Sequence, residues 1–348
     1  MSLHSQEVQL FASDNYAGAH PAVVEALAAA NGGHVRSYGV DPYTDLLRDR
    51  FKDLFGGNAE VFPTLTGTGS NVVALQSLAA RHESIICART AHIHVDEGGS
   101  PERFGLKLLT VPTEHGKLTV DSVRTEAWGW GDQHRGQPGV LSITQSSELG
   151  TVYTPEEIAE LTSFAHQHGM RVHLDGARLA NAAAHLGLPI KSFTTDAGVD
   201  IVSFGATKNG AVAAEAVVVL DGRSGEVLPY LRKGSAQLAS KMRFVSAQFL
   251  ALLDEGRWLS LAGHANSMAR RLADALCDFP GVQLAHPVDA NAVFAYIDPA
   301  AAEQLADDLG FYVWDGSSGL VRWMTSWDTT ELAVDNFART LRERLSVR

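Results

Sequence analysis

The sequence predicts an α/β fold with a mostly parallel sheet covered by helices on both faces. Short apolar runs rich in valine and isoleucine alternate along the chain with segments of helical periodicity. Two of these runs, 172–174 and 201–204, are nearly continuous in apolar residues, which is typical of strands buried on both faces. Each run also ends abruptly near an ionisable residue, as happens where a parallel strand delivers a reactive group to its carboxyl end.

The expected elements follow one another in a helix and strand rhythm. Helices are expected at 20–30, 44–55, 70–80, 154–168 and 177–185, and strands at 60–63, 84–87, 108–111, 140–144, 171–174, 201–204 and 214–220. A long helical region from 235 to about 275 comes next. The segments 282–286, 292–297, 300–308, 311–314, 320–324 and 330–344 then predict a smaller α+β unit. We therefore expect a large domain over 1–246, which includes an N-terminal arm, and a small C-terminal domain over 247–348.

Composition frames the possible functions. At 348 residues, 45% hydrophobic and 20% charged, the chain can bury a large core. The formal net charge of −12 gives no basic surface for nucleic acid or anionic membrane. No apolar run approaches a membrane span and residues 1–7 lack a secretion signal, so we expect a cytoplasmic protein. Two cysteines, Cys87 and Cys277, make a disulfide framework or a metal cluster improbable.

Lys208 follows one of the apolar runs directly. A lysine at the end of a core strand either loses its proton or finds an ionic or covalent partner, and a neutral amine can attach a carbonyl cofactor. Pyridoxal phosphate (PLP) needs such a lysine, a carboxylate for its ring nitrogen and a cradle for its phosphate. The sequence offers candidates for all three.

Asp175 closes the preceding strand, and Arg178 follows within one helical turn. A desolvated carboxylate there would stay ionised beside a protonated pyridine nitrogen. Alternatively, Asp175 only caps the next helix. Arg178 is either a surface residue or a guanidinium that faces the same cavity and binds a carboxylate.

Gly67, Thr68 and Gly69 lie between a predicted strand and a predicted helix. Amides freed by glycine, a hydroxyl from Thr68 or Ser70, and the positive end of a helix dipole make an anion site that suits a phosphate. A plain strand-to-helix turn is the alternative. A dinucleotide site is less well supported, because it requires a third small residue where Val72 stands.

In order and spacing, these motifs resemble the low-specificity L-threonine aldolase family, in the beta-eliminating lyase and threonine aldolase group of PLP-dependent enzymes of fold type I. The resemblance covers nearly the whole chain. It rests on Ser13-Asp14-Asn15, Tyr38-Gly39-Val40-Asp41-Pro42, Gly67-Thr68-Gly69-Ser70-Asn71, Ala91-His92 with Glu97-Gly98-Gly99, Leu174-Asp175-Gly176-Ala177-Arg178, Thr207-Lys208 and Val321-Arg322. It implies the PLP-dependent transferase-like fold, with a three-layer αβα large domain and a smaller α+β domain.

The resemblance also implies a reaction and roles for particular residues. The reaction is retro-aldol cleavage of L-threonine, L-allo-threonine and related β-hydroxy-α-amino acids to glycine and an aldehyde. Lys208, His92 and Asp175 would be catalytic; Gly67, Thr68, Gly69, His92, Asp175, Arg178, Lys208 and Arg243 would bind PLP; and Ser13, Arg178 and Arg322 would bind the substrate carboxylate. In this family His92 would stack on the cofactor ring.

The base that removes the β-hydroxyl proton stays open. His92 is one candidate, acting directly or through water. His94 would point the opposite way if its segment is extended. Many family members have a histidine in the region where this chain has Ser147 and Glu148. Glu148 is therefore either a proton acceptor or a solvated loop acid, and the second interpretation is slightly favoured.

Quaternary structure and two rival activities complete the expectations. Fold type I enzymes build their sites at a dimer interface, so we expect a homodimer or homotetramer in which Arg243 is either a phosphate ligand or part of a solvated helix face. A beta-eliminating lyase would share every cofactor residue. A nicotinamide-dependent oxidoreductase would use the glycine loop alone, and a regulatory PLP-binding protein would lack turnover.

Overall fold

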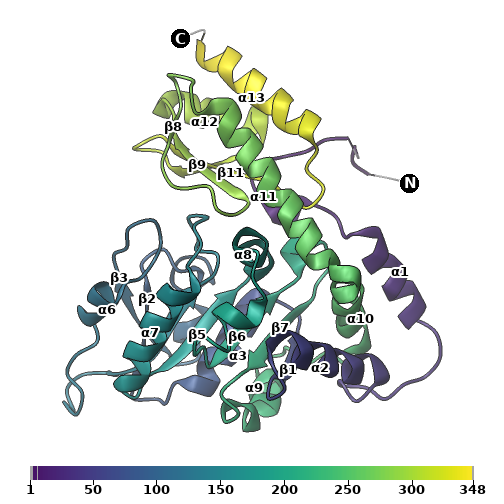
Figure 1. Cartoon of the computed structure of the whole chain (residues 1–348), viewed down its shortest axis with the longest axis vertical. Helices are drawn as coiled ribbons and strands as arrows, with labels where there is room; N and C mark the ends of the chain where they lie inside the picture. Colours follow the sequence, from purple (N-terminus) through teal and green to yellow (C-terminus); the bar gives the residue numbers. More distant parts are fainter. Residues whose placement is uncertain (1–2, 6, 347–348) are drawn as a thin grey trace.

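The computed structural model describes residues 3–5 and 7–346 and contains one large and one small sheet (Figure 1). Residues 1, 2 and 6, which belong to the stretch expected to lack a secretion signal, lie outside the described residues. In spatial order the large sheet consists of β1 (Glu60–Thr64), β7 (Glu215–Val219), β6 (Ile201–Gly205), β5 (Arg171–Gly176), β4 (Gln137–Thr144), β2 (Glu83–Ala88) and β3 (Lys107–Val111). Within this sheet, β7 is antiparallel to both neighbours and the other pairings are parallel. The predicted α/β class with a mostly parallel sheet is confirmed.

The central strands are buried on both faces. Every residue of β6 and β7 is buried, as is all of β5 after its first residue. Because successive side chains of a strand point to opposite faces, this pattern requires a cover on each side of the sheet.

Helices supply that cover. They are α1 (Pro21–Ala30), α2 (Pro42–Phe55), α3 (Gly67–Leu78), α4 (His92–Val95), α5 (Ser100–Arg103), α6 (Val120–Arg124), α7 (Pro155–Gln167), α8 (Leu179–Leu186), α9 (Leu228–Gly234) and α10 (Arg243–Leu253), with short 3₁₀ turns η1 (Asp14–Tyr16), η2 (Ile190–Phe193), η3 (Thr207–Asn209) and η4 (Ser224–Glu226). The short helices α4, α5 and α6 are additions to the predicted set, because four or five residues are too few to show a helical period.

The prediction of a long helical region from residue 235 to about 275 is wrong at its start and at one point in its middle. Residues 235–242 form turns and irregular backbone, and Ala236 has φ +59°. The turn η5 (Asp254–Gly256) then separates α10 from α11 (Arg257–Leu276), with φ +53° at Glu255. A residue in the left-handed region cannot continue a right-handed helix, so the chain changes direction there.

The small sheet is antiparallel, in the order β10 (Tyr312–Asp315), β11 (Leu320–Met324), β9 (Ala292–Tyr296) and β8 (Gln283–Leu284), and it packs with α12 (Pro299–Leu309) and α13 (Glu331–Ser346). In Figure 1, α11 runs from this unit down to α10 beside the large sheet. Trp258 on α11 belongs to the large core, whereas Leu272 on the same helix and Phe11 of the N-terminal arm belong to the small core. A boundary at 246/247 therefore stays a prediction.

Within the described part of the chain, none of the helices combines the length and the apolar character needed to cross a bilayer.

His173 ties three central strands together through its side chain. Its Nδ1 lies 2.9 Å from Ser142 Oγ on β4, and its Nε2 lies 2.9 Å from Ser203 Oγ on β6. Burial lowers the pKa of His173 to about 4, so the imidazole is neutral in the folded protein.

This neutral imidazole should make the fold sensitive to acid. Between pH 6.5 and 4 the unfolded chain binds a proton at this position that the folded chain does not, so stability falls as the pH falls. At pH 5 the loss is about 2 kcal/mol relative to pH 8. Urea unfolding at both pH values should show this loss in the wild type and a smaller one in His173→Gln. Equal losses in both proteins would contradict the assignment.

Candidate active site

The candidate residues gather at one edge of the large sheet. Strands β1, β2, β4, β5 and β6 run in the same direction, so their carboxyl ends lie together. Asp175 lies at the end of β5, and the segments that follow β1, β2, β4 and β6 carry Gly67, His92, Glu148 and Lys208 respectively. Residues spread over about 140 positions of sequence thus belong to one site.

Lys208 lies in η3, directly after β6, and is half-buried. The positive charge of Arg178 and the burial of the amine lower its pKa, against the attraction of Asp14, Asp175 and Glu215. The amine therefore loses its proton more readily than a solvent-exposed lysine. A more readily lost proton is one of the alternatives that the sequence predicted for a lysine at this strand end.

Asp175 is buried at the end of β5 and has a defined set of donors. Its Oδ1 accepts from the Ala177 amide at 3.0 Å, and its Oδ2 accepts from Asn71 Nδ2 at 2.8 Å. Helix α8 starts at Leu179 with Arg178 in the N-cap position, so Asp175 does not cap it. A carboxylate has about four acceptor positions, and two donors leave room for a ligand N–H.

A chain of hydrogen bonds links Asp175 to His92. Asn71 Nδ2 also donates to Glu97 Oε1 at 2.8 Å, and that oxygen lies 3.0 Å from His92 Nδ1. The hydrogen bond with Glu97 is the main cause that raises the pKa of His92. Because a carboxylate only accepts, Nδ1 must carry the proton, which leaves the lone pair of neutral His92 on Nε2.

Glu148 is not a solvated loop acid, so the slightly favoured interpretation is wrong. Its Oε1 accepts from the His92 amide at 2.9 Å, and its Oε2 is buried with no hydrogen-bond partner among the described residues. Burial raises the pKa of Glu148 to about 7. The segment of His94 is helical, not extended, and His94 is exposed on α4.

The opening turn of α3 presents two amides to an anion. Thr66 caps this helix: its Oγ1 accepts from Gly69 N at 3.1 Å and its carbonyl from Ser70 N at 2.9 Å. The amides of Gly67 and Thr68 are left for a ligand in this turn. The Gln237 side chain packs where a Cβ of Gly69 would stand, which explains a glycine there without a phosphate contact.

Arg178 and Asp14 form a buried ion pair. Arg178 Nε donates to Asp14 Oδ2 at 2.7 Å and its Nη2 to Asp14 Oδ1 at 2.9 Å. Asn291 Nδ2 adds a third donor to Asp14 at 3.1 Å. Arg178 was predicted to bind the substrate carboxylate, but its Nε and Nη2 donors already bind Asp14.

Arg322 on β11 lies close enough for its charge to interact with that of Arg178. Burial, followed by the positive charge of Arg178, lowers the pKa of Arg322 to about 10. Its Nη2 donates to Ala12 O at 2.9 Å, whereas its Nε is buried without a partner among the described residues. Asp14 forms its ion pair with Arg178, so the guanidinium of Arg322 adds a positive charge to this part of the site.

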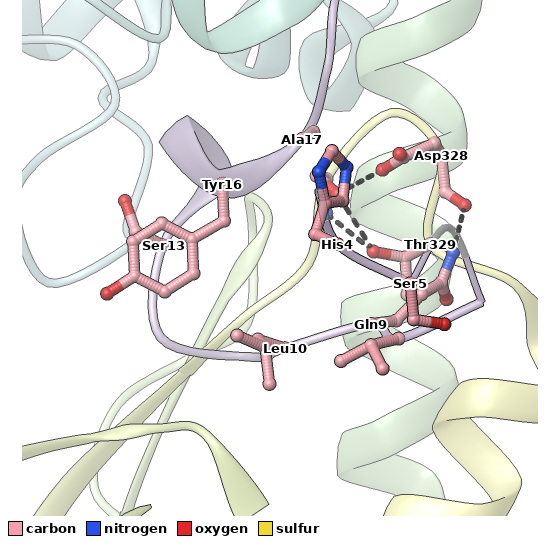
Figure 2. Close-up of a pocket in the computed structure, with 11 residues that line it drawn as sticks. His4, Ser5, Gln9, Leu10, Ser13, Tyr16, Ala17, Asp328 and Thr329 are labelled. Carbon is pink, nitrogen blue, oxygen red and sulfur yellow. Dashed lines mark hydrogen bonds between the residues drawn. The ribbon is translucent and has the colours of Figure 1, made fainter. Parts of the chain in front are cut away.

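Ser13 and Arg243 are the remaining predicted residues. Ser13 lies beside Asp14, its Oγ accepts from Asn15 N at 3.2 Å, and it lines a cavity of about 340 Å³ with Tyr16, Gln9 and Asp328 (Figure 2). Lys208 and Asp175 do not line this cavity. Arg243 Nη1 donates to Gly33 O at 3.3 Å, so its predicted contact with phosphate stays a prediction.

Several residues that shape the site were not predicted to do so. Asp14, Asn71 and Glu97 stand inside the quoted motifs, but no spacing rule pairs them with Arg178, Asp175 and His92. The sequence did contain an indication for Glu215, since it is an acid inside the apolar strand predicted at 214–220.

Known proteins resemble this chain over nearly its whole length. The model of the beta-eliminating lyase family matches residues 11–300. A low-specificity L-threonine aldolase of Pseudomonas sp. (strain NCIMB 10558) is 43% identical over 98% of this chain and 99% of its own length. One from Saccharomyces cerevisiae is 28% identical over 79% of this chain and 70% of its own length. Among solved structures, the Leishmania major threonine aldolase has a TM-score of 0.89 at 27% identity and covers 96% of this chain and 99% of its own.

Glu97→Gln should lower the pKa of His92. The hydrogen bond with Glu97 is the main cause that raises the pKa of His92. Without it, the burial of His92 and the positive charge of Lys208 still lower this pKa. An NMR titration of His92 in the cofactor-free protein measures the shift. Asp96→Asn is the control, because this exposed carboxylate lies 3.8 Å from His92 Nε2 and should matter less. A larger shift in Asp96→Asn would contradict the assignment.

Proposed function

Because this chain belongs to the beta-eliminating lyase family, and within it to the low-specificity L-threonine aldolases, we propose that it cleaves L-threonine, L-allo-threonine and related β-hydroxy-α-amino acids to glycine and an aldehyde. The family is PLP-dependent, and the chain is a lyase. The observation that carries the proposal is that Lys208, Asp175 and Arg178 lie at one edge of the large sheet, with Arg322 of the small sheet close enough to interact with Arg178.

The residues at this edge fit PLP. Asp175 has acceptor positions left beside Asn71 and Ala177, the pKa of Lys208 is lowered, and the amides of Gly67 and Thr68 open α3. We propose that Lys208 holds the cofactor, that Asp175 pairs with its ring nitrogen and that α3 binds its phosphate. When bound, PLP supplies an electron sink for the bond that breaks at the α-carbon.

Arg322 and Arg178 are proposed to hold the substrate carboxylate. Arg322 Nε has no hydrogen-bond partner among the described residues and offers a donor, and Arg178 binds Asp14 through Nε and Nη2, so its Nη1 is not used in that pair. Ser13 directly precedes Asp14 in the chain, and its hydroxyl group can donate its proton. A carboxylate held at two points fixes rotation about the bond from nitrogen to the α-carbon, so that the Cα–Cβ bond is the one that is weakened.

His92 is proposed to stack on the cofactor ring and to accept the proton of the β-hydroxyl group at Nε2. The hydrogen bond from Nδ1 to Glu97 leaves Nε2 with a lone pair and stabilises the protonated ring that results. Glu148 is the second candidate base, since its pKa of about 7 suits proton exchange at neutral pH.

Quaternary structure and location also belong to the proposal. Tyr38 and Val40 are exposed apolar residues in one of the motifs that carry the family resemblance, which suits a subunit contact. We propose a cytoplasmic homodimer or homotetramer with the site at the dimer interface. The mass of the assembly in solution distinguishes a monomer from either.

Lys208→Ala should lose both turnover and the visible absorption band of the PLP-loaded protein, because no other amine is proposed to hold the cofactor. The assay follows acetaldehyde and glycine from L-threonine, alongside the spectrum before and after borohydride. Lys241→Ala removes an exposed lysine and should change neither. A Lys208→Ala protein that keeps the band and the activity would contradict the proposal. Pyruvate and ammonia as products of the wild type would favour the beta-eliminating lyase.

Arg322→Lys should raise KM by about tenfold and change kcat much less. A lysine keeps the charge but cannot reproduce the planar donor edge of a guanidinium. Steady-state kinetics with L-threonine measure both constants, and Arg339→Lys, an exposed site on α13, is the control. An unchanged KM in Arg322→Lys would exclude this arginine from the carboxylate site.

A further inference from the structure

Glu215 is a buried carboxyl between the two strands that lead into the site. It is the first residue of β7 and pairs with Thr64 at the end of β1 and with Gly205 at the end of β6. Strand β1 leads to the opening turn of α3, and β6 leads to Lys208. The side chain is thus placed between the proposed phosphate amides and the proposed cofactor lysine.

The carboxyl group faces the backbone of both segments. Its Oε2 lies 3.0 Å from the point where a Cβ of Gly205 would stand and 4.0 Å from the corresponding point at Gly67. The hydroxyl and the amide of Thr207 donate to it. Glu215 therefore fills the space beneath the first turn of α3, held in place by Thr207.

Few charges offset a negative charge at Glu215. Lys208 attracts its carboxylate and Asp175 repels it, while the facing residues of β1 and α3, Thr64 and Gly67, are uncharged. Burial raises the pKa of Glu215 to about 7. At pH 8 roughly nine in ten molecules of the free protein then carry the ionised form. A bound phosphate brings a further charge of about −1.5 to −2.

We propose that Glu215 takes up a proton when the phosphate group of PLP binds at the opening turn of α3, so that a neutral carboxyl lies beneath the phosphate. This inference rests on the proposed cofactor placement. The proton comes from solvent, and no other bond of Glu215 changes. The like charges of a phosphate and a carboxylate in a buried site disfavour the ionised acid, and protonation removes that repulsion.

The test counts protons by calorimetry. The cofactor-free full-length protein is titrated with PLP at pH 8 in buffers of different ionisation enthalpy, which gives the net number of protons taken up per PLP bound. The same titration is run with pyridoxal, which can also attach to Lys208 but has no phosphate. Glu215→Gln keeps an acceptor for Thr207 and cannot titrate. Glu60→Gln removes an exposed carboxylate on neighbouring β1 and serves as the matched control.

With PLP at pH 8, the wild type and Glu60→Gln should each take up about 0.5–0.9 more protons than Glu215→Gln. With pyridoxal the difference should fall below half of that. PLP should also bind Glu215→Gln up to about tenfold more tightly than the wild type at pH 8, and with nearly equal affinity at pH 6. Equal proton counts in the wild type and Glu215→Gln would overturn the inference. An equal difference with both ligands would also overturn it, because it would assign the proton to the attachment at Lys208.

Two further results keep the test decisive. If Glu215→Gln does not fold, infrared difference spectra of the wild type replace it: a protonated carboxyl band should appear with PLP and not with pyridoxal, and its absence overturns the inference. If PLP does not bind to the wild type, this result contradicts the proposed function, and it also overturns the inference about Glu215. Normal PLP binding with equal proton counts removes the role of Glu215 alone.

Discussion

The buried ion pair of Arg178 and Asp14 is the interaction on which the rest of the site depends. Burial opposes the ionisation of Asp14, but the charge and the hydrogen bonds of Arg178 outweigh it and lower the pKa of Asp14. Phe11, three residues before Asp14, packs in the small core, Asn291 donates to Asp14 from the small unit, and Arg178 belongs to the large one. One carboxylate thus fixes the N-terminal arm between the two parts of the chain.

The same pair sets the electrostatics around Lys208. The guanidinium of Arg178 is the main cause that lowers the pKa of the Lys208 amine, and Asp14 keeps that guanidinium in place. Together with Arg322, the pair leaves positive charge on the side proposed for the substrate carboxylate. The acids Asp175 and Glu97 belong to a separate hydrogen-bonded group that runs through Asn71 to His92.

Much of the site could be predicted from the sequence because parallel strands end at one edge. A mostly apolar run of three or four residues is enough to place Asp175 or Lys208 at that edge, and the alternation of helices and strands is enough to predict a mostly parallel sheet. The pairing partners could not be predicted. Asp14 and Arg178 are 164 residues apart, and Asn71 and Asp175 are 104 apart, so only the folded chain brings them together. The helix break at Glu255 was not predicted, because the residues on both sides of it have the composition of a helix. The burial of the Glu148 carboxyl group was not predicted, because an acidic side chain in a loop is normally solvated.

Locating the covalent attachment of the cofactor tests the central claim most directly. The PLP-loaded protein is reduced with borohydride and digested, and the modified peptide is identified by mass spectrometry. The account predicts a single pyridoxyl group, on Lys208. A pyridoxyl group on another lysine, such as Lys233 or Lys241, or a fully active protein that carries none, would contradict it.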